Sequence, residues 1–217
     1  MAKILDLVSM YSSFLPVGVG LLLFSSSISS VKKTIVFFII TAAFDAIVFS
    51  MAHEGKNNIP IINIFELTET IFILYLFSLY TNKQNFRRAA FAAGIVYILC
   101  WIAIYLSIYS LYSFTPNEKI ARGALLMIFV IWLLIVTSNG LQIPLAKNYS
   151  FWIGLGFLLY FSSTLIIMGT SQMVFTGEKN ILLHYSWTLH STITIITNFI
   201  FSYGLVCSYQ NRKSFLS

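Results

Sequence analysis

The sequence predicts an all-helical integral membrane protein, folded as a single bundle of seven transmembrane helices. Of its 217 residues, 58% are hydrophobic and only 9% are charged, whereas soluble domains usually carry about 25% charged residues. The mean hydropathy is +0.85, and a membrane-spanning helix needs roughly 20 predominantly apolar residues. We therefore expect one domain, residues 1–217, with no room for a soluble catalytic domain. The predicted helices cover 10–29, 34–52, 60–81, 89–111, 121–141, 150–174 and 182–208.

The first stretch, 10–29, contains Pro16 and runs into a serine-rich end. Proline is tolerated in membrane helices when neighbouring groups satisfy the freed carbonyl, and serines allow helices to approach closely. Near the N-terminus, Lys3 is soon followed by Asp6, and no small-residue cleavage site follows a short apolar core. We expect a permanent helix here and not a cleavable signal peptide.

The second and third stretches carry acidic residues inside apolar sequence. Asp45 lies within 34–52, and both Glu66 and Glu69 lie within 60–81. Charged residues are rare inside a bilayer, because each costs several kcal/mol unless it is paired, neutralised or hydrated. These acids therefore require either a structural or a functional explanation.

The remaining four stretches differ in character. The fourth is rich in aromatic residues, which fill packing space or lie at the headgroup level. The fifth is nearly pure hydrocarbon and ends at Asn139-Gly140, a stop signal. The sixth has Gly154 near its start, and the seventh is the most polar of all, with His190 near its middle. The two cysteines, Cys100 and Cys207, lack metal-site spacing and predict no disulfide framework.

Loop charges predict the orientation of the bundle. Five basic residues fall on one side, namely Lys3, Lys56, Lys119, Arg122 and Lys179. Eight fall on the other, namely Lys32, Lys33, Lys83, Arg87, Arg88, Lys147, Arg212 and Lys213. The positive-inside rule places the larger group in the cytoplasm, so we expect an outer N-terminus and a cytoplasmic C-terminus in a bacterial inner membrane. The loop acids all fall on the outer side: Asp6, Glu54, Glu118 and Glu178.

The net charge of +6 does not indicate nucleic-acid binding. The cations lie in short loops beside apolar helices, where membrane topology and anionic lipid headgroups account for them. No basic helix or aromatic platform accompanies them. The partner that the composition predicts is the lipid bilayer.

Four ionisable residues fall at one depth when helical rise is counted from the outer ends of their stretches. At about 1.5 Å per residue, Glu66 and Glu69 lie roughly 9–14 Å below the outer end, Asp45 about 10 Å and His190 about 12 Å. Polar stripes in a bundle face the interior or water, not lipid. We therefore expect a polar cavity in the outer half of the membrane, lined by the second, third and seventh helices.

Candidate ligand-binding residues follow from that layer and from the polar stripes around it. Tyr105 of the fourth helix and Gln172 of the sixth are further contributors. We predict no catalytic residue and no cofactor. The predicted ligand-binding residues are Asp45, Asn63, Glu66, Glu69, Tyr160, Trp187, His190 and Asn198.

Several roles remain open for such a cavity. Carboxylates and a histidine suit the sensing of a cationic or polar ligand, and protonatable groups also suit a small transporter or channel. Metal-dependent hydrolysis is a further alternative, with Glu66, Glu69 and His190 as weak ligand candidates because no Glu-x-x-His or His-x-x-x-His pair is present. The remaining possibility is structural: neutral groups that hydrogen-bond across helices. Retinal is excluded, because no lysine lies between Leu182 and Ser208.

Three motifs resemble those of a known group of membrane proteins. They are the run Asn63 to Glu69 with the apolar continuation Phe72 to Tyr80, the run Phe151 to Ser162, and the run Trp187 to Ser191 followed by Asn198. They resemble helices three, six and seven of small seven-helix proteins of Bacteroidota, which look like the membrane sensor portions of histidine kinases. The resemblance covers nearly the whole chain. It implies a non-enzymatic sensor or signalling-accessory module, and no kinase domain follows Ser217, so we expect output through a separate membrane protein or self-association.

Overall fold

The structure is a computed structural model that describes residues 2–139, 144–175 and 181–216. Over these residues the chain forms helices only, and seven of the resulting spans are long and apolar enough to cross a membrane. This confirms the predicted all-helical, multi-pass architecture. The helices are α1 (Ala2–Ser12), α2 (Phe14–Leu23), α3 (Ser29–His53), α4 (Ile59–Leu79), α5 (Gln84–Ser107), α6 (Pro116–Ser138), η1 (Leu145–Lys147), α7 (Tyr149–Phe175) and α8 (Ile181–Leu216).

The first span begins earlier than predicted and ends earlier as well. It covers Ile4–Leu23 instead of 10–29, and it is divided at Ser13 into α1 and α2. Pro16 explains the division, because it lacks the N–H that would bond the carbonyl of Ser12 and its ring crowds that carbonyl. The predicted serine-rich helix end is instead a turn that leads to α3.

The connection between α3 and α4 is a compact turn that brings two spans together. Gly55 adopts a φ of 68°, a left-handed conformation that suits glycine after a helix end. The amide of Lys56 donates to the carbonyl of Met51 at 2.9 Å, and that of Gly55 donates to Ala52 at 3.2 Å. These two bonds form a Schellman motif, which satisfies the last carbonyls of α3.

The start of α6 corrects the sequence prediction most. The helix was expected at 121–141, with Glu118, Lys119 and Arg122 counted as loop charges, but it begins at Pro116, a favourable first position because proline has no N–H to leave unpaired. Glu118, Lys119 and Arg122 therefore lie in the first two turns of α6 and are buried. They are part of the interior of the bundle and do not belong to a solvated loop.

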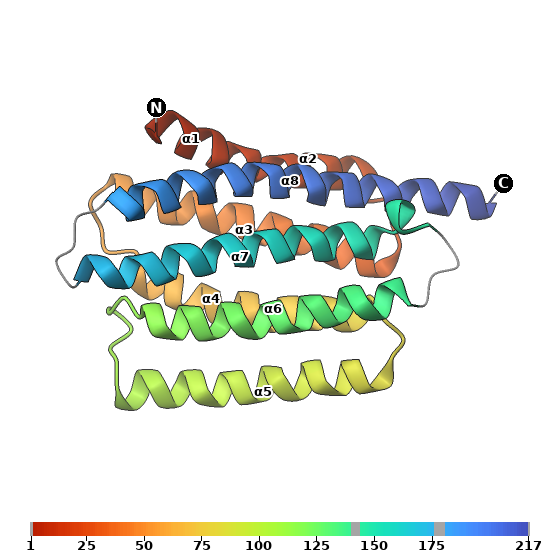
Figure 1. Ribbon diagram of the computed structural model, residues 1–217. Coiled ribbons are helices and arrows are strands. Elements are labelled where there is room, and N and C mark those ends of the chain that lie inside the picture. Colours follow the sequence, from red (N-terminus) through yellow and green to blue (C-terminus); the bar gives the residue numbers. More distant parts are fainter. Residues whose placement is uncertain (1, 140–143, 176–180, 217) are drawn as a thin grey trace.

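Six spans form a closed ring through their helix contacts, and Figure 1 shows the helices running along one common direction. Going round it, α2 packs on α3, α3 on α4, α4 on α6, α6 on α7, α7 on α8 and α8 on α2. Helix α5 lies outside this ring and packs on α4, while α1 packs on α8. Outward side chains are large and apolar, including Leu22, Phe91 and Leu106, as expected for a surface that faces lipid chains.

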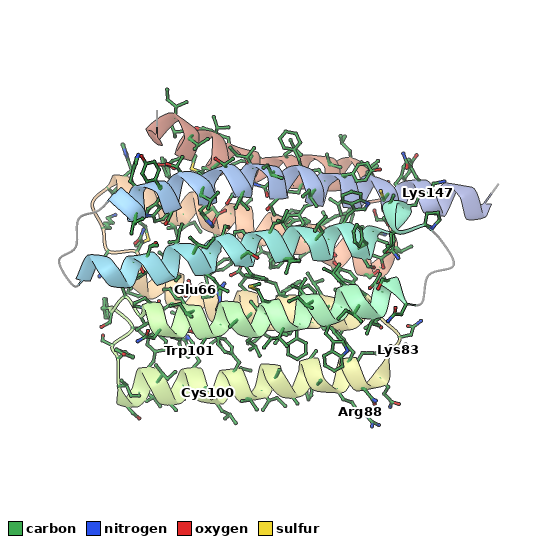
Figure 2. All side chains as sticks on the ribbon, viewed as in Figure 1. Glu66, Lys83, Arg88, Cys100, Trp101 and Lys147 are labelled. Atoms are coloured by element: carbon green, nitrogen blue, oxygen red, sulfur yellow. The ribbon has the colours of Figure 1, made fainter. Side chains whose placement is uncertain are left out.

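The two ends of the bundle differ in charge. Lys83, Arg88 and Lys147 lie at the end opposite to the α3–α4 turn, whereas Glu66 lies in the other half of the bundle (Figure 2). Alternate loops thus return to the same end, as the predicted topology requires. Of the cations used to predict orientation, Lys179 and the side chains of Lys3, Arg212 and Lys213 lie outside the described residues.

Candidate functional site

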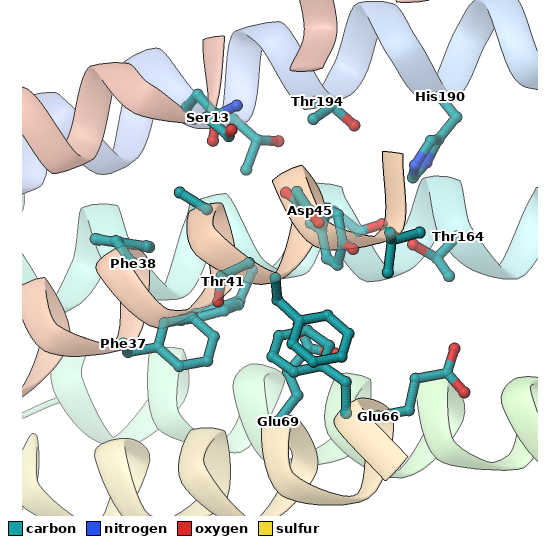
Figure 3. Close-up of a pocket in the computed structure, with 18 of the residues that line it drawn as sticks. Ser13, Phe37, Phe38, Thr41, Asp45, Glu66, Glu69, Thr164, His190 and Thr194 are labelled. Carbon is teal, nitrogen blue, oxygen red and sulfur yellow. Dashed lines mark hydrogen bonds between the residues drawn. The ribbon is translucent and has the colours of Figure 1, made fainter. Parts of the chain in front are cut away.

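A cavity of about 380 Å³ lies inside the six-helix ring. Helices α3, α4, α7 and α8 supply most of its wall, with Arg122 from α6 and Pro16 from α2. Figure 3 shows His190 and Thr194 on α8 at one side, Asp45 on α3 between, and Glu66 and Glu69 on α4 at the other side. Two pairs of consecutive helices, α3 with α4 and α7 with α8, therefore share one cavity.

Seven of the eight predicted ligand-binding residues line this cavity. The carboxyl groups from two helices and the histidine from a third lie around this one cavity. Tyr160 of α7 completes the set on the fourth helix. The seven residues are Asp45, Glu66, Glu69, Tyr160, Trp187, His190 and Asn198.

Asn63 is placed elsewhere by the structure. Its side chain is fully buried and donates to the carbonyls of Leu111 at 2.8 Å and Ser113 at 3.2 Å in the α5–α6 connection. Its own carbonyl oxygen lies 3.4 Å from the ammonium of Lys119. Asn63 thus fastens a loop and a cation to α4 and does not line the cavity.

Both glutamates of α4 are paired with cations of α6. The ammonium of Lys119 donates to Oε2 of Glu66, and the guanidinium of Arg122 donates to Oε2 of Glu69 through Nη2 at 2.6 Å and Nη1 at 3.2 Å. The second pair is almost completely buried, with each side chain 7% exposed. Charged side chains inside membrane spans are normally paired in this way.

Asp45 is different, because no cation and no hydrogen-bond donor among the described residues contacts its carboxylate. It is exposed to the cavity. The carboxylates on the cavity wall are Asp45, Glu66 and Glu69. The cations that line the cavity or pair with these carboxylates are Lys119 and Arg122. Asp45 is therefore the carboxylate that remains without a counter-ion in this part of the bundle.

His190 faces the cavity in a defined orientation. Its Nδ1 lies 2.9 Å from Oγ of Ser163, which also donates to the carbonyl of Tyr160 at 2.8 Å. A serine hydroxyl has one proton and a carbonyl can only accept. Both contacts are satisfied when Ser163 donates to the carbonyl and Nδ1–H of His190 donates to Ser163. The lone pair of a neutral His190 then resides on Nε2.

Three threonines of the cavity wall lack hydrogen-bond partners. Other threonines of α3, α4, α7 and α8 donate to the carbonyl four residues earlier, as Thr164 does to Tyr160 at 2.9 Å. The hydroxyls of Thr41, Thr194 and Thr197 are buried and make no such bond within the described residues. Buried polar groups are normally hydrogen-bonded, so these hydroxyls are unsatisfied among the described residues; they expose almost no surface and are therefore packed behind the wall and not open to the cavity.

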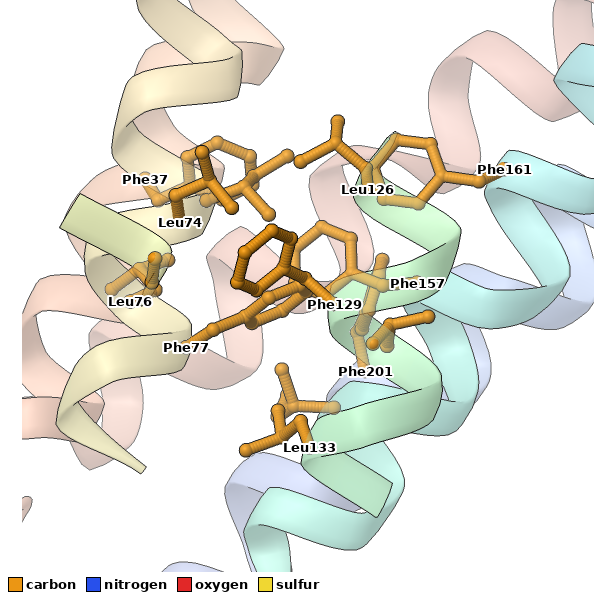
Figure 4. Close-up of a cluster of buried hydrophobic side chains, with 14 of the residues drawn as sticks. Phe37, Leu74, Leu76, Phe77, Leu126, Phe129, Leu133, Phe157, Phe161 and Phe201 are labelled. Carbon is orange, nitrogen blue, oxygen red and sulfur yellow. The ribbon is translucent and has the colours of Figure 1, made fainter. Parts of the chain in front are cut away.

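Packed aromatic rings, shown in Figure 4, lie on the side of the cavity away from the α3–α4 turn. The ring of Phe157 lies 4.9 Å from that of Phe201, 5.4 Å from Phe77 and 5.9 Å from Phe37. Phe38 also contacts Phe201, with a ring separation of 4.8 Å. Lining residues nearer the α3–α4 turn are more open, as the half-exposed Trp187 shows. The rings therefore fill the bundle on the side of the cavity that lies farther from the α3–α4 turn.

The other candidates from sequence do not join this site. Tyr105 contacts Thr115 at 3.0 Å, between α5 and α6, and the side chain of Gln172 lies outside the described residues. Glu66, Glu69 and His190 were weak metal-ligand candidates. No group of three or more His, Cys, Asp or Glu side chains with metal-binding geometry occurs in the described part of the chain, and both glutamates already bind cationic side chains.

Sequence reasoning missed Lys119 and Arg122 as partners of the buried acids, although a signal was present. Glu66 and Glu69 are three residues apart near the start of α4, and Lys119 and Arg122 have the same spacing near the start of α6. Both pairs join residues 53 apart in sequence, so two parallel helices match in register. No family model, curated protein or solved structure matches this chain.

Proposed function

We propose that this protein is a membrane ligand sensor, with its binding cavity in the outer half of a bacterial inner membrane. The observation that carries the proposal is the pair of polar groups on the cavity wall: Asp45, an acid without a counter-ion among the described residues, and His190, an imidazole whose Nε2 remains an acceptor. A purely structural polar cluster would satisfy these groups among themselves, as the two glutamates of α4 are satisfied by α6.

The one-sided shape of the cavity favours sensing over transport. A transporter needs a route to both sides of the membrane, at least alternately. Here the packed rings of Phe37, Phe157 and Phe201 fill the bundle below the cavity. A ligand that enters from the α3–α4 end would be held there and would not be passed through.

Helix α8 offers a path for output. It contributes Trp187, His190 and Asn198 to the cavity and continues as one helix to Leu216, past η1 at the other end of the bundle (Figure 1). A rigid helix that contacts the ligand near one end moves at its other end as well. We propose that a separate membrane signalling protein, or a second copy of this chain, reads that movement.

The proposed orientation places the cavity mouth outside the cell. Burial of Lys119 and Arg122 removes both from the loop count, so the outer side keeps three of its five cations while the other side keeps eight. The bias that determines membrane orientation is therefore stronger than the sequence alone suggested.

Ligand binding to the reconstituted protein tests the proposal. A panel of neutral, cationic and anionic small molecules is titrated against protein in nanodiscs, with tryptophan fluorescence as the readout. We expect saturable binding that is lost in Ala42→Leu, which fills the cavity at a 3% exposed wall position. The control Ala92→Leu, on the exposed face of α5, should bind as the wild type does.

Transport and hydrolysis assays separate the alternatives. Proteoliposomes should show no flux of a compound that binds and no turnover of lipid. Flux that is abolished by Glu66→Gln or Glu69→Gln would identify a transporter instead. Stoichiometric metal that is lost in His190→Ala, together with a hydrolysed lipid, would identify a metal-dependent enzyme.

A further inference from the structure

The charge of the cavity wall restricts what the cavity can hold. Glu66 and Glu69 are neutralised by Lys119 and Arg122, so Asp45 leaves one negative charge in excess. Glu118 is a further acid and supplies no counter-charge; it lies against α5, where it accepts a hydrogen bond from Tyr97 at 2.7 Å. An unmatched carboxylate in a membrane span is unfavourable, and a single positive charge in the cavity removes that cost.

The polar groups on the wall around Asp45 are acceptors, so they favour a ligand that donates hydrogen bonds. The carboxylate accepts only, and so does Nε2 of a neutral His190. The terminal nitrogens of Arg122 already donate to Glu69, so the guanidinium is engaged with that carboxylate. An ammonium group, which has up to three donors and no acceptor, complements this wall, whereas a carboxylate or phosphate would face Asp45 directly.

The size and lining of the cavity require more than an inorganic ion. A volume of about 380 Å³ falls within the range of about 300–1,000 Å³ that is typical of small-molecule pockets. Rings of Phe44 and Phe65 stack at 3.8 Å between centroids in the wall, and Tyr160 and Trp187 contribute further aromatic surface. Aromatic side chains bind both apolar groups and organic cations.

We infer that the cavity binds a small protonated monoamine with an apolar body, with Asp45 as its counter-ion and Nε2 of His190 as a second acceptor. This inference rests on the proposed ligand-binding function and specifies its ligand class. A diamine is a poorer fit, because the other lining carboxylates already have cationic partners. The aromatic rings of the wall surround the apolar body.

A matched pair of probes tests the charge requirement on the wild-type protein. The amine 2-phenylethylamine and the alcohol 2-phenylethanol have nearly the same size, and only the first is cationic at pH 7. In nanodiscs of phosphatidylcholine and phosphatidylglycerol, we expect the amine to bind at least about tenfold more tightly, which corresponds to about 1.4 kcal/mol. Equal binding of both probes, or binding of neither, would overturn the amine inference; the ligand-binding function itself fails only if no compound of the panel of neutral, cationic and anionic molecules binds.

Two variants assign the charge to Asp45. Asp45→Asn keeps the shape of the side chain and should weaken the amine at least about tenfold while leaving the alcohol unchanged. Glu54→Gln removes an exposed acid that pairs with Lys56 at the same end of the bundle and should change neither affinity. Amine binding that is unaffected by Asp45→Asn would contradict the inference.

A lipid arm distinguishes two sources of the same chemistry. The ethanolamine headgroup is itself a monoamine and could enter from the bilayer. If lipid supplies the ligand, adding phosphatidylethanolamine to the nanodiscs weakens the apparent affinity for 2-phenylethylamine in proportion to its content. If a soluble amine is the ligand, that affinity is unchanged. In either case the amine binds at Asp45, so Asp45→Asn should weaken amine binding with and without phosphatidylethanolamine.

Discussion

Arg122 donates two hydrogen bonds to a single carboxylate oxygen of Glu69, at 2.6 and 3.2 Å, and both side chains are 7% exposed. The pair joins α4 to α6 directly beside the cavity. Its burial means that neither partner can lose the other without leaving an uncompensated charge inside the bundle. The α4–α6 contact therefore depends on both residues together.

Breaking this pair should destabilise the protein strongly. Arg122→Met leaves Glu69 without its cation and should lower the free energy of unfolding by about 3–5 kcal/mol, measured in mixed detergent micelles. The double variant Glu69→Leu with Arg122→Met removes both charges and should recover most of that loss. The exposed pair of Lys56 and Glu54 is the control, and Lys56→Met should cost at most about 1 kcal/mol. Additive losses in the double variant would contradict a direct pair.

Asp45→Asn should have the opposite effect on stability. The carboxylate has no counter-ion among the described residues, so its neutralisation removes an unfavourable charge from the span. We expect the free energy of unfolding to rise by about 1 kcal/mol, as happens when a strained functional site is relieved. The same measurement on Glu69→Gln should show a loss. Destabilisation by both variants would mean that Asp45 has a partner comparable to Arg122.

Gly156 permits the close contact between α7 and α8. A Cβ at this position would collide with the ring of Phe201, so Gly156→Ala should cost about 1–3 kcal/mol through overpacking. Gly169 lies on the same helix, and the place that an added methyl group would take there has no neighbouring atom within 4 Å. Gly169→Ala should be neutral or stabilise by up to about 1 kcal/mol, because alanine favours the helix. Thermal unfolding of the two variants side by side measures the difference.

Asn63 should matter for folding and not for ligand affinity. Asn63→Leu leaves the carbonyls of Leu111 and Ser113 without their donor, which should cost about 1–3 kcal/mol. Asn85→Leu changes an exposed residue at the start of α5 and should stay within about 0.5 kcal/mol of the wild type. A large loss of affinity for 2-phenylethylamine in folded Asn63→Leu would place Asn63 in the binding site after all.

Orientation can be measured by cysteine labelling in intact cells. In a background without Cys100 and Cys207, Lys56→Cys places a thiol in the α3–α4 turn and Lys83→Cys places one between α4 and α5. A membrane-impermeant maleimide should label the first variant from outside and the second only after the cells are opened. The reverse pattern would place the cavity mouth in the cytoplasm.

The helices and most of the cavity could be predicted from the sequence, because both depend on local patterns. Apolar length identified the spans, and helical rise placed Asp45, Glu66 and His190 at one depth. The burial of Lys119 and Arg122 could not be predicted from such local patterns. Charge counting treats a cation near a helix end as a loop residue, and only the packing of α6 against α4 shows that these two enter the bundle.

Asn63 illustrates the same limit on a single helix. It shares a polar stripe with Glu66, and the stripe was predicted to face a ligand. The side chain instead turns to the carbonyls of the α5–α6 connection, whose position depends on tertiary packing. Helical periodicity can predict that a side chain faces the interior of the bundle. It does not predict whether that side chain lines a cavity or hydrogen-bonds to a neighbouring backbone.

A structure of the protein in a lipid nanodisc, determined with 2-phenylethylamine present, tests the shared binding cavity most directly. We predict density for the amine inside the six-helix ring, with its nitrogen within hydrogen-bond distance of Asp45 and Nε2 of His190. A ring in which Asp45, Glu69 and His190 face different directions, or a cavity filled by side chains, would contradict the shared site.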